Sequence, residues 1–134
     1  MTEQYTILLA EDDVDDQELI VHAFTEVTSD FRLHIVNDGK ELINFLTTTS
    51  DNKLPCLIVL DYNMPEMNGA QVLQMLTGDK RYENIPKIIL STSSNPKYIQ
   101  DCLHKGANAY RVKPDSFSQL VVLAKEMLEL CSAA

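Results

Sequence analysis

Residues 57–65 read Leu57-Ile58-Val59-Leu60-Asp61-Tyr62-Asn63-Met64-Pro65, four branched apolar residues that end on a carboxylate and a proline turn. Four residues are too few for a helix, and a continuous apolar run is typical of a strand buried on both faces of a parallel sheet. Asp61 then lies at the carboxyl end of this strand, the edge where open α/β sheets bind ligands. An aspartate after a strand can also simply begin a turn, so the rest of the chain must decide between these interpretations.

Strand patterns recur at residues 5–10, 31–36, 87–90 and 109–112, and apolar residues at helical spacing follow each strand. Segment 31–36 alternates apolar and polar residues, which indicates a strand at the edge of a sheet. Five β-α units in succession predict one α/β domain over residues 1–134. We expect a three-layer, doubly wound, five-stranded parallel sheet of flavodoxin-like order 2-1-3-4-5.

Local signals add detail to three of the connections. Asp38, with Glu41 three residues later, predicts a capping box at the start of the second helix. The polar segment 47–53 predicts a loop of above-average length. Asp15 and Asp16 lie in the first turn of the first helix, where their charge suits the positive end of the helix dipole.

The chain carries 20 acidic and 11 basic residues, a formal net charge of −9. This charge argues against a nucleic-acid partner, because phosphate backbones need clustered Lys and Arg. A divalent cation or a basic protein surface is the expected partner. Because no apolar run approaches the roughly 20 residues that span a bilayer, and the first residues lack a basic and apolar signal segment, we expect a cytoplasmic protein without a membrane partner.

The three cysteines, Cys56, Cys102 and Cys131, lie far apart and inside or beside apolar patterns. An odd, scattered set without a Cys-x-x-Cys motif predicts neither a disulfide framework nor a zinc site. We expect buried thiols that behave as small apolar side chains.

Polar residues follow four of the five predicted strands. These strands end on Glu11 and Asp12, on Asp61, on Ser91 and on Lys113. Because parallel strands end at the same edge of a sheet, we expect these carboxylates, the hydroxyl and the ammonium group to converge.

Carboxylates that converge in this way repel one another, so the predicted site should recruit a divalent cation. Oxygen ligands favour Mg²⁺, which also coordinates phosphate. An aspartate can act as the nucleophile of phosphoryl transfer, a reaction that needs mainly positioning and charge neutralisation. Lys113 and the Ser91 hydroxyl would then bond phosphoryl oxygens. The residues therefore predict a phosphate acceptor at Asp61.

At these positions the chain resembles the receiver domain of response regulators in two-component signalling, the family of the chemotaxis regulator. The matching motifs are Leu9-Ala10-Glu11-Asp12-Asp13, Leu60-Asp61-Tyr62-Asn63-Met64-Pro65-Glu66-Met67-Asn68-Gly69, Leu90-Ser91-Thr92 and Tyr110-Arg111-Val112-Lys113-Pro114. The resemblance covers essentially the whole chain. It implies that Asp61 accepts a phosphoryl group from a phosphohistidine of a sensor kinase or a histidine phosphotransfer protein. A narrower similarity is to the single-domain regulators that serve phytochrome-type kinases.

The resemblance also implies the ligands of the metal ion and the contacts of the phosphoryl group. Mg²⁺ would be held by Glu11, Asp12, Asp61 and the backbone carbonyl of Asn63. Ser91 and Lys113 would contact the acyl phosphate, and the Lys113-Pro114 peptide bond is expected to be cis.

Further roles implied by the resemblance concern the response to phosphorylation. Ser91 and Tyr110 would form the switch, in which the aromatic ring turns inward when the hydroxyl is drawn to the phosphoryl group. Asn63 and Ser93 fall where the family tunes the lifetime of the acyl phosphate.

The chain stops after its fifth predicted helix, so we expect a single receiver domain without an effector domain. It would signal by binding a downstream protein when phosphorylated, or pass the phosphate along a relay. It would not be an enzyme with a separate substrate, although it takes part in its own phosphoryl transfer and is expected to autodephosphorylate. By resemblance, the partner and homodimer surface comprises the fourth helix, the fifth strand and the fifth helix.

Three alternatives remain open. A degenerate receiver that acts as a phosphorylation-independent scaffold should lack some site residues, and all are present. A flavodoxin-like electron carrier would need a phosphate-cradling loop of Ser, Thr and Gly after the first strand, where this chain has Glu11-Asp12-Asp13. A haloacid-dehalogenase-type phosphatase would want a second aspartate two residues after the nucleophile, where this chain has Asn63.

Overall fold

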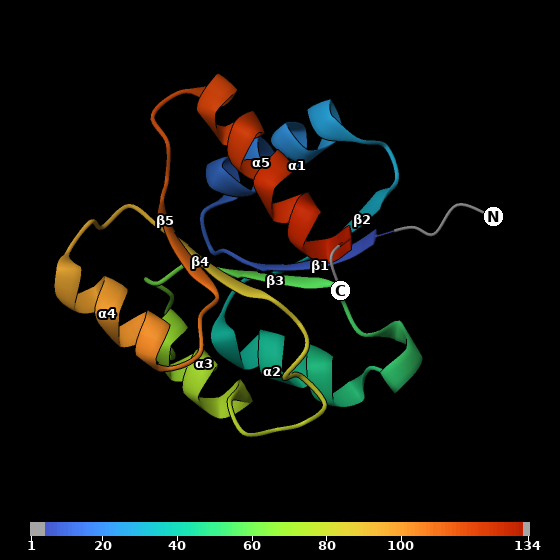
Figure 1. Ribbon diagram of the computed structural model, residues 1–134, viewed down its shortest axis with the longest axis vertical. Helices are drawn as coiled ribbons and strands as arrows, with labels where there is room; N and C mark the ends of the chain where they lie inside the picture. The colour runs from blue at the N-terminus through green and yellow to red at the C-terminus, as the bar shows by residue number, and fades with distance from the viewer. Residues whose placement is uncertain (1–4, 133–134) are drawn as a thin grey trace.

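Five parallel strands form one sheet with helices on both faces in the computed structural model, which describes residues 5–132 (Figure 1). The strands are β1 (Tyr5–Ala10), β2 (Phe31–Val36), β3 (Leu57–Leu60), β4 (Lys87–Ser91) and β5 (Ala109–Val112). Their spatial order is β2-β1-β3-β4-β5, and each neighbouring pair is parallel. The predicted fold class and strand order are confirmed.

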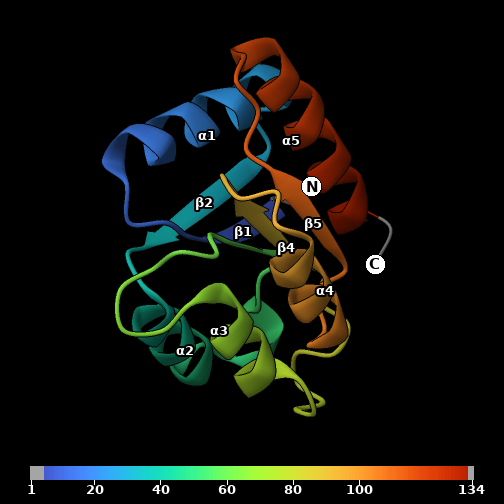
Figure 2. The same ribbon diagram turned by 90° about the vertical axis from the view of Figure 1, so that its left-hand side faces the viewer.

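Two helices cover one face of the sheet and three cover the other. The helices are α1 (Val14–Val27), α2 (Gly39–Thr48), α3 (Gly69–Leu76), α4 (Pro96–His104) and α5 (Phe117–Ser132). Figure 2 shows α1 and α5 on one side of the strands, and α2, α3 and α4 on the other. Within the described part of the chain, no helix combines the length and the apolarity that crossing a membrane requires.

The central position of β3 follows from its composition. All four of its residues are fully buried. Leu57 and Val59 pack in the core layer with α1 and α5, whereas Ile58 and Leu60 pack in the layer with α2 and α3. Because successive side chains of a strand point to opposite faces, only a run that is apolar at every position satisfies both layers.

The edge strand agrees with expectation, whereas two of the connections differ from it. β2 lies at the sheet edge and alternates in burial, as predicted. Asp38 caps α2 by accepting from the Glu41 N–H, but the Glu41 carboxylate accepts from Asn37, so the predicted capping box forms only in part. Segment 47–53 is not the long loop expected, because α2 continues to Thr48 and the 3₁₀ turn η1 occupies Asp51–Lys53.

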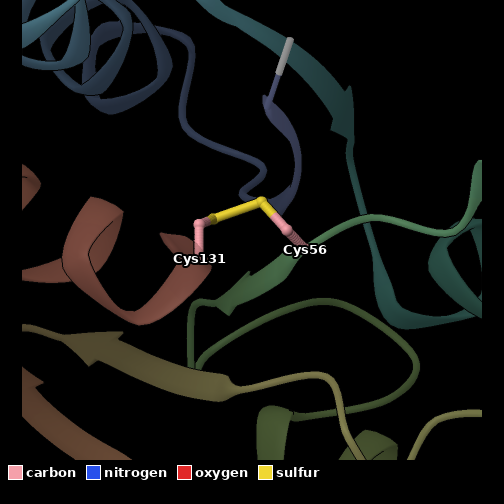
Figure 3. The surroundings of a disulfide bond; sticks show 2 residues. All are labelled: Cys56 and Cys131. Atoms are coloured by element: carbon pink, nitrogen blue, oxygen red, sulfur yellow. A yellow bond between two sulfur atoms is a disulfide. The ribbon is translucent and has the colours of Figure 1, made fainter. Parts of the chain in front are cut away.

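The prediction that all three cysteines are thiols is wrong for two of them. Cys56, just before β3, and Cys131, in the last turn of α5, form a disulfide bond (Figure 3). The pair is 75 residues apart in sequence, and packing of α5 on the sheet brings the two Cα atoms to 5.0 Å. Cys102 is a buried thiol, as expected.

The core layer under α1 generates a test of stability. Phe24 is fully buried between α1 and the sheet, whereas Leu19 on the same helix is 47% exposed. We expect Phe24→Ala to lower the free energy of unfolding by about 3–5 kcal/mol, because it removes buried apolar contacts and leaves a cavity.

Leu19→Ala is the matched control, with an expected loss under about 1 kcal/mol. Urea denaturation followed by circular dichroism measures both variants. Equal losses for the two would contradict the described packing of α1.

Candidate functional site

The ends of four strands meet at one edge of the sheet. Glu11 follows β1, Asp61 follows β3, Ser91 ends β4 and Lys113 follows β5. Backbone bonds continue the ladder into these residues, because Asp61 donates its N–H to Ala10 at 3.0 Å and Lys113 donates to the Ser91 carbonyl at 2.7 Å. The sheet itself therefore fixes where the four side chains begin.

Three carboxylates gather at this edge. Carboxylate oxygens of Glu11, Asp12 and Asp61 lie within 4.8 Å of one another. Glu11 is 1% exposed and Asp61 is 8% exposed, while Asp12 faces solvent. Carboxylates that are open to water on one side match the ligand preference of Mg²⁺, which combines a few protein oxygens with several waters. The donor set fits a hard divalent cation.

Lys113 links the carboxylates to one another. Its Nζ donates to Glu11 Oε1 at 2.6 Å, to Asp16 Oδ2 at 2.7 Å and to Asp61 Oδ2 at 3.4 Å. These three acids come from the end of β1, from the first turn of α1 and from the end of β3. Ammonium and carboxylate groups therefore form one connected network.

Burial shifts the pKa values within this network. Burial raises the pKa of Glu11 to about 7, because desolvation and the Asp61 charge outweigh the hydrogen bond from Lys113. Burial alone would lower the pKa of Lys113, but its bonds to Asp16 and Glu11 and the Asp61 charge outweigh desolvation and raise that pKa above its usual range. Glu11 is therefore a group of the site that exchanges a proton near neutral pH, while Lys113 stays charged.

The turn after Asp61 has little freedom. Gly69 donates its N–H to the Tyr62 carbonyl at 2.9 Å, and a Cβ at Gly69 would lie 3.0 Å from the Asp61 carbonyl oxygen. Asn63 is exposed, and its N–H reaches Asp61 Oδ1 at 3.4 Å. The close approach of the chain at Gly69 thus holds the turn that carries Asn63 against the acidic cluster.

A second network surrounds the hydroxyl at the end of β4. Ser91 is fully buried, and its Oγ accepts from the Ser93 N–H at 3.1 Å. The Tyr110 hydroxyl donates to the Ser93 carbonyl at 2.8 Å, and its ring is buried. Ser91, Ser93 and Tyr110 are therefore joined through one short segment of backbone.

The structure places the predicted site residues in two groups. Glu11, Asp12, Asp61 and Lys113 cluster at the acidic edge, with Asn63 in the turn beside Asp61. Ser91, Ser93 and Tyr110 form the second network, which the Lys113 N–H joins at the Ser91 carbonyl.

The structure also adds residues that the sequence did not assign to the site. Asp16, interpreted from sequence as a partner of the helix dipole, bonds Lys113 directly. Gln17 donates to the Glu11 carbonyl at 2.6 Å and so holds the end of β1. Tyr62 stacks on Tyr98 of α4 with ring centroids 4.8 Å apart. No sequence pattern pointed to these contacts. Those of Asp16 and Tyr62 join segments that only the tertiary fold brings together, and that of Gln17 depends on how α1 leaves the end of β1.

The expectation of a cis Lys113-Pro114 bond is wrong. No peptide bond within residues 5–132 is cis. The trans isomer is intrinsically favoured by about 0.5–1 kcal/mol before proline, and the Lys113 contacts described above form with the trans bond.

Comparison with known proteins agrees with the geometry of this edge. The family model described as the response regulator receiver domain matches residues 7–125. A chemotaxis protein CheY homolog from Campylobacter jejuni is 32% identical, over 92% of this chain and 88% of that protein.

Solved structures give the same result. The phosphorylated cyanobacterial phytochrome response regulator RcpA has a TM-score of 0.86 and 32% identity, with 98% of this chain and 96% of that chain covered. The Mn²⁺-bound form of response regulator Rcp1 has a TM-score of 0.79 and 29% identity, with 91% and 90% covered. With the fold, the acidic edge and these matches taken together, the chain belongs to the response regulator receiver domain family of two-component signalling.

Proposed function

We propose that this chain accepts a phosphoryl group on Asp61 from a phosphohistidine of a sensor histidine kinase or a histidine phosphotransfer protein. The observation that carries the proposal is the contact of Lys113 with both Asp61 and Glu11 beside the exposed Asp12. A carboxylate nucleophile, a fixed cation and further carboxylates at one solvent-accessible edge are the groups that phosphoryl transfer to an aspartate requires.

In the proposed reaction an Asp61 carboxylate oxygen attacks the phosphorus atom. The P–O bond forms as the P–N bond to the donor imidazole breaks, and the imidazole takes a proton. The Lys113 ammonium lies 3.4 Å from Asp61 Oδ2, close enough to bond an oxygen of the incoming phosphoryl group. The Ser91 hydroxyl would bond a second oxygen.

Glu11, Asp12, Asp61 and the Asn63 backbone carbonyl would hold Mg²⁺. When bound, Mg²⁺ neutralises charge on the phosphoryl oxygens as the transfer proceeds. The closeness of the three carboxylates and the burial of Glu11 support this assignment, because a buried acid with a raised pKa gains from a cationic partner.

The proposed switch uses the second network. If Ser91 Oγ turns to a phosphoryl oxygen, the Ser93 N–H loses its present acceptor. The Tyr110 hydroxyl donates to the carbonyl of the same Ser93. Phosphorylation of Asp61 would therefore change the surroundings of Tyr110 in β5. Asn63, whose N–H reaches Asp61 Oδ1, and Ser93, whose N–H bonds Ser91 Oγ, would tune the lifetime of the acyl phosphate, which we expect to hydrolyse by autodephosphorylation.

We further propose a cytoplasmic location and a partner surface on α4, β5 and α5. Tyr98, Leu103, Val112 and Val122 are apolar or aromatic residues of these elements that are exposed. Tyr98 also stacks on Tyr62, which follows the proposed acceptor. A downstream protein or a second copy of the chain would cover this surface.

Phosphorylation is tested with small-molecule donors. Incubation with Mg²⁺ and acetyl phosphate or phosphoramidate should add one phosphoryl group to the protein, as measured by intact mass spectrometry. Asp61→Asn should abolish the gain, because the amide is not a nucleophile for this reaction.

Asp15→Asn is the matched control. Asp15 is an exposed acid of the first turn of α1, and its removal should leave the gain intact. Absence of phosphorylation in the unsubstituted protein would contradict the proposal and favour a phosphorylation-independent scaffold.

The pKa of Glu11 gives a pH dependence of Mg²⁺ binding. Because the pKa of this carboxyl is about 7, a proton competes with the metal below that pH. The apparent affinity for Mg²⁺ should fall roughly tenfold from pH 8 to pH 6, as measured by isothermal titration calorimetry.

Glu11→Gln should bind Mg²⁺ more weakly and with a flatter pH dependence, since the titrating group is gone. An equally steep loss of affinity in this variant would show that another group binds the competing proton.

The switch is tested at Ser91. In the unsubstituted protein, phosphorylation should shift the Ser93 amide and Tyr110 ring resonances in NMR spectra. Ser91→Ala should still gain the phosphoryl group on Asp61 but lose most of these shifts, because the hydroxyl that changes partner is missing.

Ser94→Ala, which removes an exposed hydroxyl of the same segment, should keep them. Shifts of full size in Ser91→Ala would eliminate the proposed role of this hydroxyl.

A further inference from the structure

A cavity of about 790 Å³ lies at the end of the sheet opposite Asp61 and is unrelated to the phosphoacceptor. Its lining includes the disulfide-bonded Cys56 and Cys131 together with residues of β2 and of the segment after α2. Cys56 precedes β3 and Asp61 follows it, so their Cα atoms are separated by roughly 16 Å. A volume of this size suits a small molecule.

The cavity is basic although the protein is acidic. Arg32, His34 and Lys53 line it, and none of the other described lining residues is a carboxylate. Arg32 and Lys53 are exposed, and no ion pair joins either of them to another described residue. In a chain with a net charge of −9, two cations beside a disulfide that are unpaired among the described residues select for an anion.

The cavity wall around the disulfide is ordered by packing. His34 stacks on Phe45 with ring centroids 4.1 Å apart, and the Cys56 N–H donates to the Thr6 carbonyl at 2.8 Å. Cys56 is partly exposed, whereas Cys131 is 6% exposed. Cys56 is therefore the more exposed residue of the bonded pair.

We propose that this cavity is a thiol–disulfide exchange site, at which an anionic low-molecular-mass thiol is held by Arg32 and Lys53 and attacks Sγ of Cys56. A bond forms between the incoming sulfur and Cys56 Sγ, and the bond to Cys131 Sγ breaks. Cys131 leaves as a thiolate and takes a proton from water.

A second thiol completes the exchange. It attacks the mixed disulfide, releases Cys56 as a thiol and leaves as the small-molecule disulfide. Overall, the protein disulfide gains two electrons and two protons from two thiols. The reverse sequence, driven by the small-molecule disulfide, forms the Cys56–Cys131 bond.

The test compares two thiols of opposite charge on the full, oxidised chain. Reduced glutathione is anionic and cysteamine is cationic, and each rate of disulfide opening is divided by the thiolate concentration. At low ionic strength glutathione should react faster, with the mixed disulfide on Cys56 found by peptide mass spectrometry. Cys102 should stay unmodified, because it is fully buried and burial raises the pKa of its thiol to about 11.

Charge variants test whether Arg32 and Lys53 bind the incoming thiol or whether exchange proceeds without them. Replacing both cavity cations, Arg32→Gln with Lys53→Gln, should lower the ratio of the glutathione rate to the cysteamine rate about fivefold or more. The control pair Lys40→Gln with Lys97→Gln removes two exposed charges of α2 and α4 and should leave the ratio unchanged.

Three outcomes would overturn the proposal. An unchanged ratio in the double cavity variant would remove the role of Arg32 and Lys53. A mixed disulfide on a residue other than Cys56 would place the reaction elsewhere. Failure of glutathione disulfide to form the Cys56–Cys131 bond in the reduced, folded protein would show that the pair does not exchange.

Discussion

The ammonium group of Lys113 bonds carboxylates from three separate segments, and the arrangement of the acidic edge depends on it. Glu11 and Asp61 are both buried acids that lie close to Asp12. Without a nearby cation, burial and the Asp61 charge would both oppose ionisation of Glu11. The proposed magnesium ion and Lys113 would therefore both neutralise the negative charge of the clustered carboxylates. A phosphoryl group would add negative charge, which both cations can also neutralise.

The parallel sheet makes this arrangement possible. Four of the five strands end on polar residues at the same edge, while the four apolar residues of β3 are shared between the two core layers. Asp61 is thus carried by the most buried strand of the molecule, and its neighbours on β1 and β4 are fixed by backbone bonds. In the proposed switch, the packed core would limit movement to side chains and to turns beyond the strand ends, such as the Ser93 backbone that hydrogen-bonds both Ser91 and Tyr110.

The two ends of β3 have opposite character. One end presents carboxylates to solvent, and the other presents a disulfide and a cavity lined by Arg32 and Lys53. The tyrosine pair Tyr62 and Tyr98 connects the acidic end to α4, and the disulfide connects the basic end to α5. Both helices belong to the surface that we propose for partners, so each end of the central strand has a direct structural connection to it.

The sequence alone determined the strand order, the buried central strand and the convergence of Glu11, Asp12, Asp61 and Lys113 at one edge of the sheet. This was possible because the spacing of apolar residues and the polar residues that follow each strand are local properties of the sequence. A parallel sheet places the ends of its strands at one edge, so these polar residues meet there. It could not identify Asp16 as a partner of Lys113, since that acid satisfies the helix dipole equally well in sequence. Nor could it pair Cys56 with Cys131 across 75 residues or recognise the trans Lys113-Pro114 bond. Those features were decided by the tertiary structure, because they depend on how helices pack on the sheet and on distances that no local pattern contains.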